Sequence, residues 1–75
     1  MRLLISEDQQ TLRDILKKRL KEDGFSVDDA PDGQEAIALL EHTLYDVVIL
    51  DIMMPYQSGL EVLSWMREQD IQTPV

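Results

Sequence analysis

The sequence predicts an α/β domain built on a short parallel sheet. Short apolar runs, typical of strands buried in such a sheet, alternate along the chain with segments whose apolar residues recur at helical spacing. Helical crossovers between consecutive strands make those strands run parallel. The 75 residues, with 44% hydrophobic content and only 3 glycines and 3 prolines, suit one small globular domain rather than a disordered or fibrous chain.

The first half of the chain is predicted to form a strand, a helix and a second strand. Residues 3–5, Leu-Leu-Ile, are a compact apolar run that suits a strand buried on both faces. Gly24 is placed to end the following helix in a left-handed conformation, and residues 25–28 alternate as in a half-exposed edge strand. The helix itself is indicated by apolar residues at helical spacing, which are Leu12, Ile15, Leu16 and Leu20.

The second half repeats this alternation. Residues 47–50, Val-Val-Ile-Leu, are the strongest strand signal, and Asp51 ends the run. Helices are expected on either side of it, each opened by residues with capping-box spacing, Asp32 with Glu35 and Ser58 with Glu61. The side chains expected to face inward are Ala36, Ile37, Leu40 and Leu44 from the helix that Asp32 opens, and Leu60, Leu63 and Met66 from the helix that Ser58 opens. Residues 72–75 are expected to begin a further strand.

The strand patterns also predict how the sheet is ordered. The second strand is the more polar and suits an edge, so the expected order is 2-1-3. Right-handed crossovers then place the first helix on one face and the other two on the opposite face. Because the chain reverses direction after the second strand, a ligand-binding crevice is expected between the carboxyl ends of the first and third strands.

Composition excludes several classes of function. The formal charge of −8 repels phosphate backbones, so this segment is not expected to bind nucleic acid. The absence of cysteine excludes a disulfide scaffold and a thiolate metal site. No apolar run reaches the roughly 18 residues of a membrane span, and no signal-peptide layout is present. We therefore expect a soluble, cytoplasmic segment that does not contact membranes.

Acidic residues follow both central strands of the predicted sheet. Glu7 and Asp8 come directly after the first strand, and Asp51 follows the third. Carboxylates on neighbouring strands repel one another, so they either raise each other's pKa or recruit a cation. A hard divalent ion such as Mg²⁺ fits, because it takes one or two carboxylates and keeps several waters. No histidine or cysteine near these acids favours zinc, and the single histidine, His42, is expected to be a solvated helix-end residue.

The position of Asp51 also suits a nucleophile. A carboxylate at the exposed end of a buried strand that attacks a phosphoryl group forms an aspartyl phosphate. Both reactants are anionic, so a metal must neutralise their charge. The three acids thus support one scheme, in which Asp51 attacks while Glu7 and Asp8 hold the metal beside it.

These residues resemble those of a known family, the receiver domain of two-component response regulators. The resemblance extends over essentially the whole chain and is carried by residues 3–8, 30–36, 46–55 and 59–61, in particular by the spacing Asp51-x-x-Met54-Pro55-x-x-x-Gly59. It implies a flavodoxin-like, doubly wound sheet. It also implies a phosphoacceptor rather than an enzyme, although the family has weak autophosphorylation and autodephosphorylation chemistry.

The resemblance further implies a role for each site residue. Asp51 would accept a phosphoryl group from the phosphohistidine of a sensor histidine kinase. Asp8 and Asp51 would bind Mg²⁺ directly, Glu7 would bind it directly or through water, and the Met53 backbone carbonyl would be a further ligand. The signal would control an output module beyond this chain, often one that binds DNA and regulates transcription.

The resemblance covers only part of the family's pattern. The family also uses a Ser or Thr after its fourth strand and a Lys after its fifth, and residues 1–75 are expected to supply only the first three βα units. We therefore expect Mg²⁺ binding with poor phosphorylation. The third strand would lack a neighbour on one side, and its apolar edge is expected to cause self-association.

Two other classes of function are open to this sequence. One is a catalytically incomplete fragment that acts only as a folding or self-association module. The other is an aspartyl-phosphate phosphatase of the haloacid dehalogenase type, which also places a nucleophilic Asp after a buried strand. That family needs a second Asp two positions later, and Met53 occupies this place.

Overall fold

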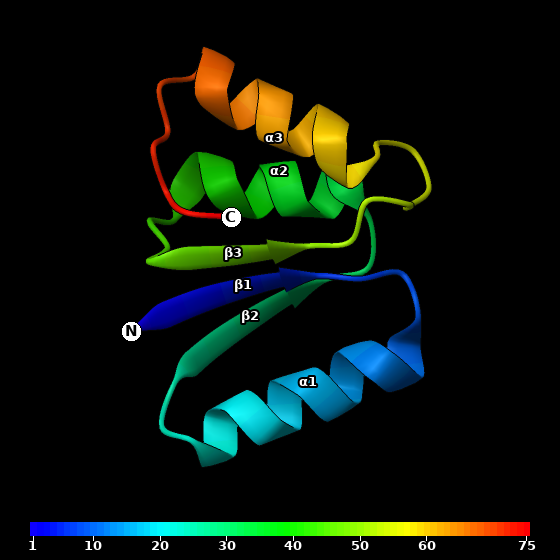
Figure 1. The fold of residues 1–75 in the computed structure, drawn as a ribbon, viewed down its shortest axis with the longest axis vertical. Coiled ribbons are helices and arrows are strands. Elements are labelled where there is room, and N and C mark those ends of the chain that lie inside the picture. Colours follow the sequence, from blue (N-terminus) through cyan, green and yellow to red (C-terminus); the bar gives the residue numbers. More distant parts are fainter.

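The computed structural model describes all 75 residues, Met1–Val75, and contains three strands and three helices in strict alternation (Figure 1). Their bounds are β1 Arg2–Ser6, α1 Gln10–Glu22, β2 Ser26–Ala30, α2 Gly33–His42, β3 Val47–Leu50 and α3 Gly59–Glu68. The sheet has the order β2-β1-β3, and both strand pairs are parallel. Helix α1 covers one face, whereas α2 and α3 cover the other (Figure 1). The predicted fold class, strand order and placement of the helices are confirmed.

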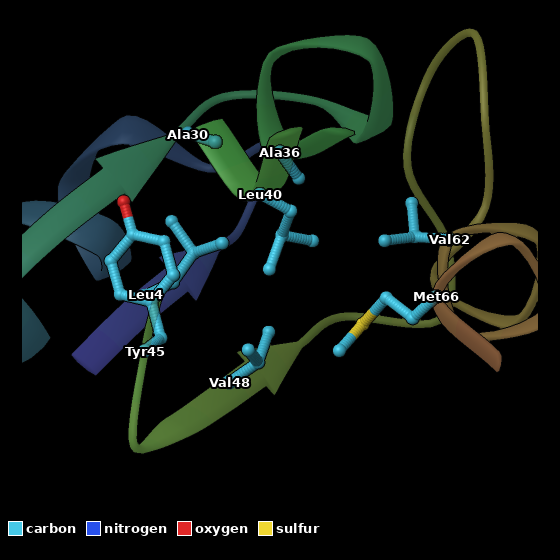
Figure 2. Close-up of a cluster of buried hydrophobic side chains, with 8 residues drawn as sticks. All are labelled: Leu4, Ala30, Ala36, Leu40, Tyr45, Val48, Val62 and Met66. Atoms are coloured by element: carbon cyan, nitrogen blue, oxygen red, sulfur yellow. The ribbon is translucent and has the colours of Figure 1, made fainter. Parts of the chain in front are cut away.

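Two apolar clusters, one on each face of the sheet, hold these layers together. Successive side chains of the central strand β1 point to opposite faces, so Leu4 enters one cluster while Leu3 and Ile5 enter the other. The larger cluster lies between the sheet and the helices α2 and α3 (Figure 2), and consists of Leu4, Ala30, Ala36, Leu40, Tyr45, Val48, Val62 and Met66. The smaller cluster is covered by two partly buried leucines of α1, Leu16 and Leu20.

The predicted helix ends are mostly confirmed. Ser58 and Glu61 form the reciprocal bonds of a capping box at the start of α3. At α2 only half of a box is present, because the Asp32 side chain accepts the Glu35 N–H at 2.9 Å without a return bond. Gly24 follows α1 with a φ of +95°, a conformation that other residues rarely adopt, and so turns the chain toward β2.

Four apolar residues of the predicted helical patterns are exposed. Leu60 is 61% exposed because α3 begins at Gly59, which places Leu60 in the first turn on the outer side, and Val62 is buried in its stead. Leu44 lies beyond the end of α2 and is 88% exposed. Leu12 and Ile15 are 40% and 59% exposed, because α1 packs on the sheet through residues further round the helix.

Two strand boundaries also differ from prediction. Strand β2 is Ser26–Ala30, one to two residues later than the alternation at 25–28 indicated, because it pairs with the whole of β1. Residues 72–75 form no assigned strand. One bond, from the Val48 N–H to the Pro74 carbonyl at 2.9 Å, nevertheless lays this segment along the side of β3 away from β1. Of the expected further strand, only this one hydrogen bond to β3 is formed.

None of the three helices combines the length and the apolar character that a membrane crossing requires.

Candidate functional site

The parallel register brings the ends of β1 and β3 to the same edge of the sheet. Ser6 is paired with Leu50 at the last position of both strands. The ladder continues one residue further, since the Asp51 N–H donates to the Ser6 carbonyl at 2.9 Å and the Glu7 N–H donates to the Ala30 carbonyl at 3.1 Å. The backbone of Glu7 and that of Asp51 are therefore fixed on neighbouring strands at this edge.

Three carboxylates gather there. One carboxylate oxygen from each of Glu7, Asp8 and Asp51 lies within 4.8 Å of the others, which is the grouping that strand-end placement predicts. Glu7 and Asp51 are half-buried and Asp8 is exposed. None of the three acids lines a pocket, so the acids form an open edge at the place where the topology predicts a ligand-binding crevice.

The electrostatics of this edge disfavour three negative charges. Partial burial raises the pKa of Glu7 above its ordinary value, and the charges of Asp51 and Asp8 raise it further. The Gln9 N–H, which donates to the Glu7 carboxylate at 3.2 Å, works in the opposite direction by favouring the charged form. A bound cation would remove this cost, because it replaces repulsion between the acids with attraction to a shared charge.

The donor set suits a hard divalent ion. All three donors are carboxylate oxygens, which Mg²⁺ prefers, and their partial exposure leaves room for the waters that this ion retains. The chain has no cysteine, and His42 lies exposed at the end of α2, so no soft ligand is at hand for zinc.

Met53, the fourth predicted site residue, lies in the loop that follows Asp51. Its backbone N–H donates to Asp51 Oδ1 at 3.3 Å, which holds this loop against the acid. Its side chain is 81% exposed and takes no part in the core. The structure thus brings three of the four residues together as side chains and adds Met53 through its backbone.

Two glycines allow the loop after Asp51 to pack closely. A Cβ on Gly59 would overlap the Asp51 carbonyl, and a Cβ on Gly33 would overlap the Gln57 carbonyl. The Gly59 N–H donates to the Ile52 carbonyl at 2.9 Å. The start of α3 is therefore pressed against the backbone of Asp51 itself, and a residue with a side chain at position 59 would force the two segments apart.

Two residues that support the site were not singled out by sequence reasoning. Ser6 is buried, and its hydroxyl donates to Met54 Sδ at 2.9 Å, which ties the end of β1 to the loop after β3. Arg13, a charged residue of α1, has a side chain that is only 12% exposed and pairs with Asp29. A small polar residue within an apolar strand was a signal for Ser6, whereas helical spacing alone gives none for Arg13.

A parallel sheet with the order β2-β1-β3, with α1 on one face and α2 and α3 on the other, has the fold of the first part of a receiver domain (Figure 1). A family model described as the response regulator receiver domain matches residues 3–75. The chain belongs to this family, and its three βα units have the flavodoxin-like arrangement expected of it.

Among curated relatives, the chain is similar to the transcriptional regulatory protein DltR of Streptococcus agalactiae, with 43% identity over all 75 residues. It spans about a third of the length of that relative, 34%. Among solved structures, it is similar to the receiver domain of the Francisella response regulator 1452, with 36% identity and a TM-score of 0.96 over 99% of this chain and 61% of that one.

A second solved relative carries a ligand. The response regulator TrrA of Thermotoga maritima, in a complex with Mg²⁺ and BeF, is 43% identical, with a TM-score of 0.86 over 91% of this chain and 59% of that one. TrrA has also been solved in a complex with the histidine kinase ThkA.

Proposed function

We propose that this chain is the phosphoacceptor part of a two-component response regulator, with Asp51 as the residue that receives the phosphoryl group. The observation that carries the proposal is the grouping of Asp51 with Glu7 and Asp8 within 4.8 Å at the end of two buried strands. Asp51 is held by its backbone to Ser6 and is half-exposed, so it is both fixed and accessible.

In the proposed reaction a carboxylate oxygen of Asp51 forms a bond to phosphorus. The bond between phosphorus and a donor's imidazole nitrogen breaks, and that nitrogen keeps the electron pair and later takes a proton. The bond from the Met53 N–H to Asp51 Oδ1 orients the carboxylate and leaves Oδ2 as the attacking atom. The proposed donor is a sensor histidine kinase, a class that the TrrA–ThkA complex illustrates for a relative.

Mg²⁺ is the proposed cofactor, held by the carboxylates of Asp8 and Asp51, by Glu7 directly or through water, and by the Met53 backbone carbonyl. When bound, it neutralises the charge that builds up between an anionic acid and an anionic phosphoryl group. The three residues with side-chain donors supply oxygen ligands only, which supports this ion over softer ones.

The product of this chemistry is a signal, so we propose a phosphoacceptor and not an enzyme that turns over a substrate. DltR is a transcriptional regulatory protein about three times longer than this chain, and the proposed output is likewise transcriptional control by a further module. Residues 1–75 then supply the first three βα units of the receiver. The proposed phosphoacceptor role and the lack of cysteine both favour a cytoplasmic location for the protein.

Incubation with acetyl phosphate and Mg²⁺, followed by intact-protein mass spectrometry, tests the proposal. Because residues 1–75 are expected to be phosphorylated poorly, we expect the mass of one phosphoryl group to be added to part of the wild type and to none of Asp51→Asn. Asp46→Asn is the matched control, because it neutralises an acid at the opposite end of β3 and should leave the adduct intact. An adduct that survives in Asp51→Asn would contradict the assignment. Mg²⁺ binding without any adduct would favour the incomplete-fragment alternative.

A further inference from the structure

Arg13 joins three elements that meet beside the acidic pair. From helix α1, its Nε donates to Asp29 Oδ2 on β2 at 3.0 Å, while its Nη1 donates to the backbone carbonyl of Glu7 at 2.9 Å. The side chain is only 12% exposed, so the guanidinium is held between these partners. Arg13 thus donates one hydrogen bond to the sheet and another to the loop that carries Glu7 and Asp8.

The carbonyl bound by Arg13 belongs to the peptide bond that joins Glu7 to Asp8. That bond is planar, so the direction of its carbonyl also sets the direction in which Asp8 leaves the strand. The other side of Glu7 is fixed as well, because its N–H donates to the Ala30 carbonyl at 3.1 Å. The Ser6–Glu7 peptide is thus held by β2, and a turn of the Glu7–Asp8 peptide breaks the bond from Arg13.

The anchor on the sheet is itself well held. Asp29 lies opposite Ile5 in the register of β2 with β1. It also accepts a hydrogen bond from Lys17 Nζ at 2.8 Å. The hydrogen bond from Lys17 is the main cause that lowers the pKa of Asp29, and Arg13 adds to it, so the carboxylate stays charged. Lys17 shares this anchor with Arg13 but makes no hydrogen bond to the loop.

A restraint of this kind is needed because the acids repel one another. Glu7, Asp8 and Asp51 have carboxylate oxygens within 4.8 Å, and a loop free to move would relax so as to separate them. Arg13 opposes this relaxation from behind the loop, through a backbone carbonyl and without touching the carboxylates.

We propose that Arg13 is a positioning residue for the acidic site: by holding the Glu7–Asp8 peptide against β2, it aims both carboxylates toward Asp51 and sets the affinity for a divalent cation. This inference rests on the proposed metal site and extends it to a residue of α1 that the ligand set does not include.

The experiment compares Arg13→Ala with the matched control Lys17→Ala. Both variants remove one cation that binds Asp29, but only the first frees the Glu7 carbonyl. In metal-free buffer we expect Arg13→Ala to shift the Asp8 amide resonance and to lower its heteronuclear NOE, which reports backbone mobility, whereas Lys17→Ala leaves both near the wild type. By calorimetry, Mg²⁺ affinity should fall about tenfold in Arg13→Ala and stay within about twofold in Lys17→Ala.

A third variant covers the case in which Arg13→Ala does not fold. Arg13→Lys keeps the charge and can pair with Asp29, but its single nitrogen lacks two separated donors, so we expect restored stability without restored Mg²⁺ affinity. Equal effects of Arg13→Ala and Lys17→Ala on the Asp8 amide and on Mg²⁺ would overturn the inference. A wild type that binds no Mg²⁺, together with a mobilised Asp8 amide in Arg13→Ala, would defeat the proposed metal site while the positioning role stands.

Discussion

Replacing Asp51 by asparagine should stabilise the metal-free protein, even though it removes the proposed phosphoacceptor. Two unit charges 4.8 Å apart repel by about 1 kcal/mol in water and more in a less polar environment. Asp51 takes part in two such pairs, with Glu7 and with Asp8. Salt screens part of this repulsion, so we expect a gain of about 1–2 kcal/mol. The asparagine oxygen can still accept the Met53 N–H, so the loop should not be disturbed.

The pH dependence of this gain follows from Glu7. Its pKa is raised in the folded state, so the folded form is favoured most below pH 4.5, the ordinary value, and loses this advantage as pH rises through the folded pKa. Asp51→Asn removes one cause of the raised value. The stabilisation should therefore be present at neutral pH and shrink as pH falls through the folded pKa of Glu7 toward 4.5, because Glu7 then becomes neutral in both proteins.

Thermal unfolding in EDTA and in saturating Mg²⁺ measures the effect. A gain of 1 kcal/mol corresponds to a rise in Tm of about 4–8 °C for a domain of this size. Mg²⁺ at about 100 times its Kd should stabilise the wild type by about 2.7 kcal/mol, and the variant by much less, so the order of stability reverses. Glu41→Gln is the control, because it removes an exposed acid of α2 outside the site. Equal gains from Glu41→Gln and Asp51→Asn in EDTA would refute the reasoning.

Three further predictions concern the surroundings of the site and the sheet edge. Gly59→Ala should lower the free energy of unfolding by about 1–3 kcal/mol in urea, because the new Cβ overlaps the Asp51 carbonyl; wild-type stability would show that the loop is looser than described. Burial and the bond to Asp28 raise the pKa of Tyr45 to about 12, so its stabilising contribution is complete below pH 10.0 and lost as pH rises through about 12. Tyr45→Phe should cost about 1 kcal/mol at neutral pH and flatten that alkaline loss, as denaturation at several pH values will show. Apart from the bond between the Val48 N–H and the Pro74 carbonyl, the side of β3 away from β1 has no backbone partner, so residues 1–75 by themselves should self-associate through it; Ile49→Lys should reduce this in sedimentation, whereas a monomeric wild type would contradict it.

Sequence reasoning was most successful where one physical rule acts alone. The apolar runs at 3–5 and 47–50 could only be buried strands, and parallel strands bring their carboxyl ends to one edge. The grouping of Glu7 and Asp8 with Asp51 follows from those two facts. The capping box at Ser58 and the left-handed Gly24 were also predictable, because each depends on local chemistry.

The errors arose where tertiary packing decides. Leu60 and Val62 fit two different helical stripes, and the packing of α3 in the larger apolar cluster, not the spacing, decides that Val62 is the buried one. Arg13 looks like a solvated charge of α1 because helical spacing does not reveal its partners on β2 and in the loop. Side chains that bridge elements distant in sequence are therefore the part of the site that pattern reasoning cannot supply.

The central claim is that the acids at the ends of β1 and β3 form one binding site for a divalent cation. Substoichiometric Mn²⁺, added while the backbone amide spectrum is recorded, reads out the location of the ion directly through paramagnetic broadening. The account predicts that the signals of Glu7, Asp8, Asp51 and Met53 broaden first, and that excess Mg²⁺ restores them. Broadening centred on another acidic region, such as Glu22 and Asp23 at the end of α1, with the strand-end signals unchanged, would contradict it.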